Sequence, residues 1–203
     1  GTQLARMEMQ IMNRALSEGA GSLINWGKNT QWAGRQLTVG LTLPLAIFNS
    51  NDIFPISADS SMPFSQHRDI LFLSGVDQEE SILVISPNSK NPLHKEVLFL
   101  KETNEHIAVW EGAKLDKDAA FQVSGVKTVY WLSQFETIFK QMMCEVDSIY
   151  LNTNEHLRAD TTVETREDRF IKKVKKDYPS HAVKRAAPIM HQLRSVKHSI
   201  ELD

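Results

Sequence analysis

The chain has 203 residues, of which 41% are hydrophobic and 24% charged, and this composition is typical of a globular protein large enough to bury its own core. The formal net charge of −2 gives no electrostatic reason to expect nucleic acid or an anionic membrane as a partner. A single cysteine, Cys144, excludes a disulfide framework within the chain and favours a reducing compartment, so we expect a cytoplasmic protein.

Residues 1–34 contain an amphipathic helical pattern, and nothing in their sequence indicates their place in the fold. The residues that follow contain short apolar runs, each of which predicts a strand: 44–50, 69–75, 81–87, 95–101, 127–133 and 147–152. In the second run Phe72 and Leu73 are expected to be fully buried in a central strand, and residues 76–80 are short enough to close a hairpin.

Three further segments predict helices between these strands. Residues 116–125 form a short helix that Gly125 closes, and residues 133–145 begin with Ser133 and Glu136 in the spacing of a capping box. Residues 164–178 form a charged helix on the surface, which ends before Pro179. One more possible strand then precedes a helix that starts near Pro188. The alternation predicts an α/β fold, a mixed sheet of about six strands with helices on both faces.

Known catalytic and metal-binding patterns do not occur in the chain. There is no phosphate-binding loop, no GxGxxG and no GxSxG. None of the histidines has the spacing of a zinc ligand; they are His67, His94, His106, His156, His181, His191 and His198. Cys144 follows Met142 and Met143 on a helix, so we expect it to pack in the core, and the turn residues Glu79 and Glu80 need no catalytic explanation.

Several motifs in order carry a resemblance to a known family. Residues 58–75 contain A-D-S, then P-F-x-Q, then an aspartate before an apolar run that ends in glycine; IAVWEGAKL (107–115) and PIMHQLRSVKHSIELD (188–203) follow. Together they resemble the amino-terminal domain of the Xaa-Pro aminopeptidases, in the creatinase and prolidase family. The resemblance implies that residues 35–187 are this domain and that residues 188–203 are a linker helix and the start of a catalytic domain. Met62, Ser65 and Lys114 depart from the residues common at their positions.

The resemblance also implies where the chemistry lies. The family's catalytic domain binds two divalent metals, usually manganese, through two Asp, one His and two Glu, so we expect no metal ligand in this segment and no activity from it alone. The amino-terminal domain helps to build oligomers and reaches toward the active site, so its partners would be its own catalytic domain, further copies and a proline-containing peptide. The matching substrate-lining positions are Asp59 and Trp110. From the residues alone, an Asx-turn is an equal alternative for Asp59, and capping of the core is an alternative for Trp110.

Two alternatives to the Xaa-Pro aminopeptidase assignment remain open. One is a prolidase, which acts on dipeptides, and the other is a relative that has lost catalysis and binds protein partners such as histones. The five metal ligands in the sequence that follows this segment would identify an enzyme, and their absence would favour a binding module.

Overall fold

The computed structural model describes residue 10 and residues 43–58, 60–104, 106, 108–109, 112–153 and 163–195. The strands are β1 (Pro44–Asn49), β2 (Pro55–Ser57), β3 (Ser60–Ser61), β4 (Ile82–Ile85), β5 (Glu96–Leu100), β6 (Thr128–Trp131), β7 (Ser148–Leu151) and β8 (Ala182–Arg185). The helices are α3 (Arg68–Ser74), α5 (Lys117–Ser124), α6 (Phe135–Met143), α7 (Arg166–Asp177) and α8 (Ala187–Ser195), with short 3₁₀ turns η1 (Pro92–His94) and η2 (Leu132–Gln134). None of these helices is long and apolar enough to cross a membrane.

Six strands form one mixed sheet in the order β6-β5-β4-β1-β7-β8. Strand β1 pairs parallel with β7 and antiparallel with β4, and β4 also pairs antiparallel with β5. The outer pairs β5–β6 and β7–β8 are parallel. Five strands therefore run in one direction and end at the same edge of the sheet, where β4 begins; we call this the carboxyl edge.

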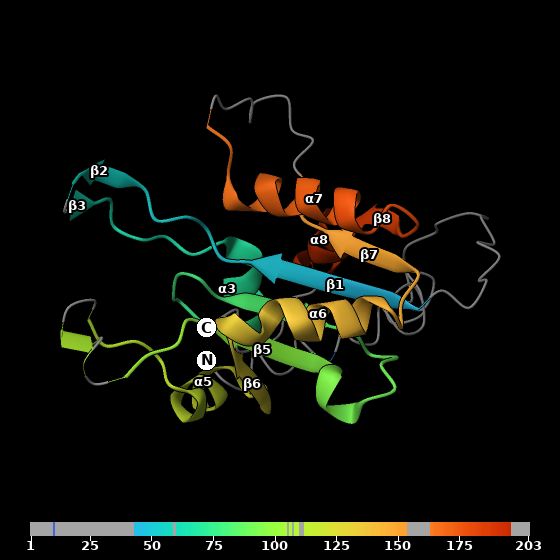
Figure 1. Ribbon diagram of the computed structural model, residues 1–203, viewed down its shortest axis with the longest axis horizontal. Helices are drawn as coiled ribbons and strands as arrows, with labels where there is room; N and C mark the ends of the chain where they lie inside the picture. The colour runs from blue at the N-terminus through green and yellow to red at the C-terminus, as the bar shows by residue number, and fades with distance from the viewer. Residues whose placement is uncertain are drawn as a thin grey trace.

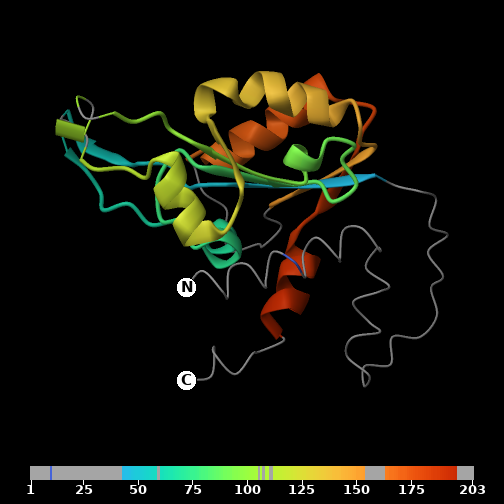
Figure 2. The same ribbon diagram turned by 90° about the horizontal axis from the view of Figure 1, so that it is seen from below.

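Helices cover both faces of the sheet, as the sequence predicts (Figures 1 and 2). Helices α3, α5 and α8 pack against alternate strand residues such as Phe48 and Leu83 on one face. Helices α6 and α7 pack against the intervening residues, such as Ile47 and Val84, on the other face. This alternation follows from the two-residue period of a strand. Because both faces are covered, all six residues of β1 are buried.

The prediction of a strand over residues 69–75 is wrong, because this segment is helix α3. The His67 side chain accepts a hydrogen bond from the Asp69 N–H at the start, and Gly75 ends the helix in the left-handed conformation at φ 69°. In a helix, Ile70 and Leu73 face the core together, whereas Phe72 is only half-buried. An apolar run of four residues fits either element, and here the caps decide. Residues 76–80 therefore join a helix to β4 and close no hairpin.

Two expectations for the helix after β6 are also wrong. Ser133 does not cap it: Ser133 lies in η2, α6 begins two residues later, and no side chain caps its N-terminus. Glu136 instead pairs with Lys173 of α7. Cys144 is exposed at the end of α6, because Met142 and Met143 occupy the core-facing positions and the next residue is rotated about 100° away.

The remaining predicted elements within the described ranges are confirmed. Strands β1, β4, β5, β6 and β7 fall within their predicted runs, and β8 is the possible strand before α8. Gly125 closes α5 at φ 71°. The charged helix is α7, which buries only Ile171 and Val174. The helical pattern near the start lies outside the described residues except for Gln10.

Replacing Leu73 by Ala should lower the free energy of unfolding by about 2–5 kcal/mol, because the side chain is fully buried and its removal leaves a cavity. Leu93, which is 57% exposed, provides a matched control, and Leu93→Ala should change stability by less than about 0.5 kcal/mol. Denaturant unfolding followed by circular dichroism measures both. Equal effects from the two substitutions would contradict the packing of α3 described above.

Candidate functional site

Both predicted substrate-lining residues, Asp59 and Trp110, lie outside the described residues, and their roles stay predictions. The segments that carry them are described on either side. Residues 51–66, which we call the arm, follow β1, and residues 101–116, which we call the second loop, follow β5. Figure 1 shows both reaching past the arrowhead of β1, so both leave the sheet at its carboxyl edge. In open α/β sheets ligands bind at this edge.

The arm is a narrow hairpin with apolar side chains on its surface. Strands β2 and β3 pair within it, and the Met62 N–H donates to the Phe54 carbonyl at 2.8 Å. Side chains at 53, 54, 56 and 62 are between 43% and 63% exposed: Ile53, Phe54, Ile56 and Met62. Exposed apolar side chains grouped on one projecting element are typical of a surface that contacts another molecule or domain.

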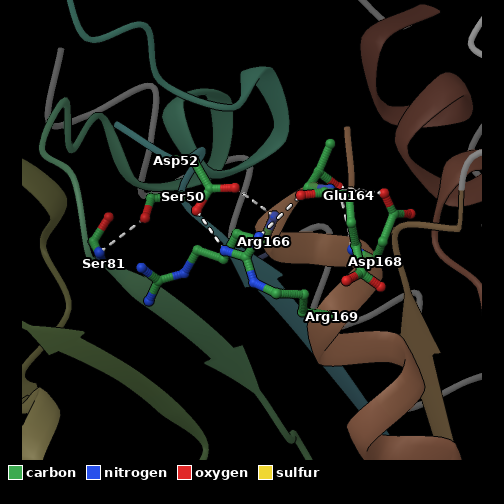
Figure 3. A network of polar contacts seen from close by, with 8 residues as sticks. Ser50, Asp52, Ser81, Glu164, Arg166, Asp168 and Arg169 are labelled. Atoms are coloured by element: carbon green, nitrogen blue, oxygen red, sulfur yellow. Dashed lines mark hydrogen bonds and ion pairs between the residues drawn. The ribbon is translucent and has the colours of Figure 1, made fainter. Parts of the chain in front are cut away.

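The base of the arm is fixed to helix α7 by Asp52 (Figure 3). One carboxylate oxygen of Asp52 accepts from the Arg166 N–H at 2.7 Å, and the other pairs with Arg169 at 2.7 Å. The carboxylate thus satisfies a free N–H at the helix N-terminus, where negative charge is favoured. Asn51 closes the base by donating from Nδ2 to the Ser65 carbonyl at 2.9 Å.

Gln66 connects the arm to the segment before β4, residues 76–81, which we call the junction turn. Its Nε2 lies 3.1 Å from the Val76 carbonyl, 2.9 Å from the Gln78 carbonyl and 3.2 Å from Ser81 Oγ. Its Oε1 accepts from the His67 N–H at 2.8 Å. With both ends of a 4%-exposed amide bonded, the end of the arm has one position relative to the junction turn.

The second loop returns to the same turn. Gln78 accepts a hydrogen bond at Oε1 from the Leu115 N–H at 2.7 Å, and Lys114 pairs with Glu79. Lys101, at the start of the loop, pairs with Glu80 at 3.0 Å. Desolvation alone would raise the pKa of Glu79, but the hydrogen bond and charge of Lys114 hold that pKa below its ordinary value.

Helix α8, which leads toward the end of the chain, is attached to α3. Arg194 of α8 forms an ion pair with Asp69, and its guanidinium carbon lies 5.2 Å from the centre of the Phe72 ring. His67 lies beside this pair; burial and Arg194 lower its pKa, and Asp69 offsets part of that effect. The end of the arm and the last turn of α8 therefore both contact the same short helix.

Sequence reasoning found part of this arrangement. It singled out Gln66 and Lys114 as motif positions without assigning them roles, and it set Glu79 and Glu80 aside as turn residues. Gln78 was missed. Its signal would have been a buried polar residue directly before an acidic pair, which sequence alone does not distinguish from a solvated turn. Within the described ranges, no three His, Cys, Asp or Glu side chains are grouped so as to hold a metal ion.

A second polar contact fixes α7 to the end of β1. The carboxylate of Glu167 accepts from Asn49 Nδ2 at 2.8 Å and from the Asn152 N–H at 3.3 Å. Burial raises the pKa of Glu167 from its ordinary value of 4.5 to about 7, against the opposing effect of these two hydrogen bonds. The folded chain therefore favours the neutral acid more than the unfolded chain does.

This contact should make stability depend on pH. Because the folded pKa of Glu167 lies above the unfolded value, its contribution is fully present below about pH 4.5 and is lost as the pH rises through about 7. The loss amounts to at most about 3 kcal/mol. We expect Glu167→Gln to remove this part of the dependence, so that the variant keeps more of its pH 5 stability at pH 8 than the wild type does. Denaturant unfolding at the two pH values checks it, and parallel pH dependence in both proteins would contradict the raised pKa.

Comparison with known proteins gives consistent matches. A family model described as "Aminopeptidase P, N-terminal domain" matches residues 32–150. Xaa-Pro aminopeptidase 3 of Homo sapiens is 29% identical over 103 residues, which are 50% of this chain and 20% of that protein. Xaa-Pro aminopeptidase of Escherichia coli K12 is 26% identical over 147 residues, 72% of this chain and 33% of that protein.

A solved structure gives the same fold. The structure of a proposed aminopeptidase P from Bacillus anthracis matches with a TM-score of 0.71 and 21% identity, over 94% of this chain and 42% of that one. The chain spans a third or less of the length of the two curated relatives described above.

Proposed function

The chain belongs to the family of aminopeptidase P N-terminal domains, and we propose that it is the non-catalytic N-terminal domain of a metal-dependent Xaa-Pro aminopeptidase. The whole protein would remove the N-terminal residue that precedes a proline. The observation that carries this proposal is the family match over residues 32–150, and the names of the two curated relatives favour an aminopeptidase over a prolidase.

In this proposal the metal chemistry belongs to the catalytic domain that would follow this segment. Two divalent ions there, manganese in our proposal, would supply the hydroxide that attacks the peptide bond. The residues described in this chain contribute positions and surfaces. The compartment would be the cytoplasm, which a single cysteine favours.

The part of this chain would be assembly and substrate gating at the carboxyl edge. The exposed apolar side chains of the arm, among them Phe54 and Ile56, support a contact with the catalytic domain or with another copy. Asp59 and Trp110 would complete the mouth of the substrate pocket. A carboxylate can pair with the α-ammonium of a peptide, and an indole can stack on a proline ring.

The direct test is hydrolysis of Ala-Pro-Ala. We expect the full-length protein with manganese to release the N-terminal alanine, and the isolated 203-residue chain to release none at the same concentration. Product analysis by mass spectrometry distinguishes removal of one residue from cleavage elsewhere. A full-length protein that is folded and manganese-loaded but inactive would overturn the enzyme proposal and favour the binding-module alternative.

Substitutions at the two pocket positions test the gating role in the full-length protein. Trp110→Ala should lower kcat/KM several-fold, on the order of 1 kcal/mol, because one stacking contact is lost, with metal content unchanged. Asp59→Asn should weaken hydrolysis of peptides with a free ammonium more than of N-blocked ones, because it removes a charge-assisted hydrogen bond.

Asp118→Asn, on the exposed face of α5, is the control and should leave the kinetics unchanged. If Asp59 only forms an Asx-turn, asparagine should replace it without effect, because both side chains support that turn. Unchanged kinetics in Asp59→Asn would therefore retire the substrate-lining role.

A further inference from the structure

We propose that the junction turn couples the arm to the second loop, and that Gln66, Gln78 and Lys114 are positioning residues that set the place of residues 112–116 relative to residues 60–66. The inference rests on the proposed function for its kinetic consequence. Its structural part, that a change at one segment is transmitted to the other, stands independently and is tested independently.

The junction turn is a fixed reference because it is bonded to the central strand. The Ser50 N–H, directly after β1, donates to the Ser81 carbonyl at 2.9 Å, and the Ser81 N–H donates to the Ser50 hydroxyl at 3.1 Å (Figure 3). Both serines are at most 2% exposed. The turn is closed internally by Ser81 Oγ, which donates to the Gln78 carbonyl at 2.8 Å.

Gln78 is where the two segments meet. Its main-chain carbonyl accepts a hydrogen bond from Nε2 of Gln66, at the end of the arm. Its side-chain oxygen accepts a hydrogen bond from the Leu115 N–H of the second loop. The residue is 5% exposed. Its own Nε2 is buried and has no hydrogen-bond partner in the described part of the chain. The hydrogen bond to its Oε1 holds the Leu115 main chain in place.

Lys114 and Glu79 fix the register of the returning loop. The lysine side chain is 6% exposed and the glutamate side chain 20% exposed, so the pair lies in a region with little solvent. Buried ion pairs add little net stability, because desolvation offsets their attraction, but separating them leaves an uncompensated charge. The pair therefore favours one position of the loop over nearby alternatives.

The kinetic test uses the full-length protein and Ala-Pro-Ala. We expect Lys114→Met to lower kcat/KM roughly fivefold, mainly through KM. In the proposed function Trp110 contacts the substrate, and a shift of residues 112–116, which follow it closely in the chain, would weaken substrate binding in ground and transition states alike. Lys114→Arg should restore most of the loss, since it keeps a cation for Glu79. Lys172→Met, which removes an exposed pair with Glu164, should have no effect.

Hydrogen exchange supplies the test that needs no activity. Gln66→Met should increase exchange roughly tenfold at residues 112–116 as well as within the arm, because the opening free energy of both segments depends on the same turn. Conversely, Lys114→Met should increase exchange at residues 60–66. If Gln66→Met does not fold, the second variant still decides the question.

The outcomes separate the two proposals. Exchange changes confined to the substituted segment would overturn the coupling, whatever the kinetics show. Coupled exchange in a full-length protein that hydrolyses no Xaa-Pro peptide would support the coupling and overturn the proposed function. Coupled exchange with an unchanged KM in Lys114→Met would overturn the positioning role.

Discussion

The burial of β1 on both faces is the constraint on which the arrangement of this domain depends. A strand with all six residues buried must satisfy its backbone through neighbours, and β1 does so between β4 and β7. Because β4 runs opposite to β1, the chain leaving β1 and the chain entering β4 lie at the same edge. Strand β5, antiparallel to β4, ends there too. The arm, the junction turn and the second loop therefore converge as a result of strand direction and of the order β5-β4-β1 in the sheet.

Where these three segments of irregular backbone meet beside a buried core, their main-chain N–H and C=O groups need hydrogen-bond partners. Gln66 and Gln78 satisfy much of it, with side chains that bond main-chain groups of other segments. Each such bond contributes only about 1 kcal/mol to stability, but leaving the group unpaired would cost more. These hydrogen bonds thus act mainly by disfavouring other arrangements of the three segments.

The strands were predictable because their signal is local. Runs such as VLFL at 97–100 and ILVI at 82–85 are apolar, short and bounded by polar residues, which is enough to predict buried strands. The run at 70–73 has a similar composition but forms a helix, which the His67 cap and Gly75 delimit. How strongly these two residues favour a helix over a strand is evident only from the backbone conformation. The predictions of a helix cap at Ser133 and of core packing at Cys144 were wrong for a related reason. The 3₁₀ turn η2 moves the start of α6 by two residues, and a helix rotates about 100° per residue, so a small error in phase exchanges buried for exposed.

The contacts of the candidate site were not predictable, since they join residues far apart in sequence. Lys114 and Glu79 are 35 residues apart, and Arg166 and Asp52 are 114 apart. Motif residues such as Gln66 lie at the base of the segments that project from the carboxyl edge. Stiff bases with exposed apolar tips suit a contact surface, as side chains and backbone that are already ordered lose less entropy on binding. Two sets of residues thus have separate roles in this domain. The apolar core residues determine the direction of the strands, and the polar residues at the carboxyl edge hold the two projecting segments in place.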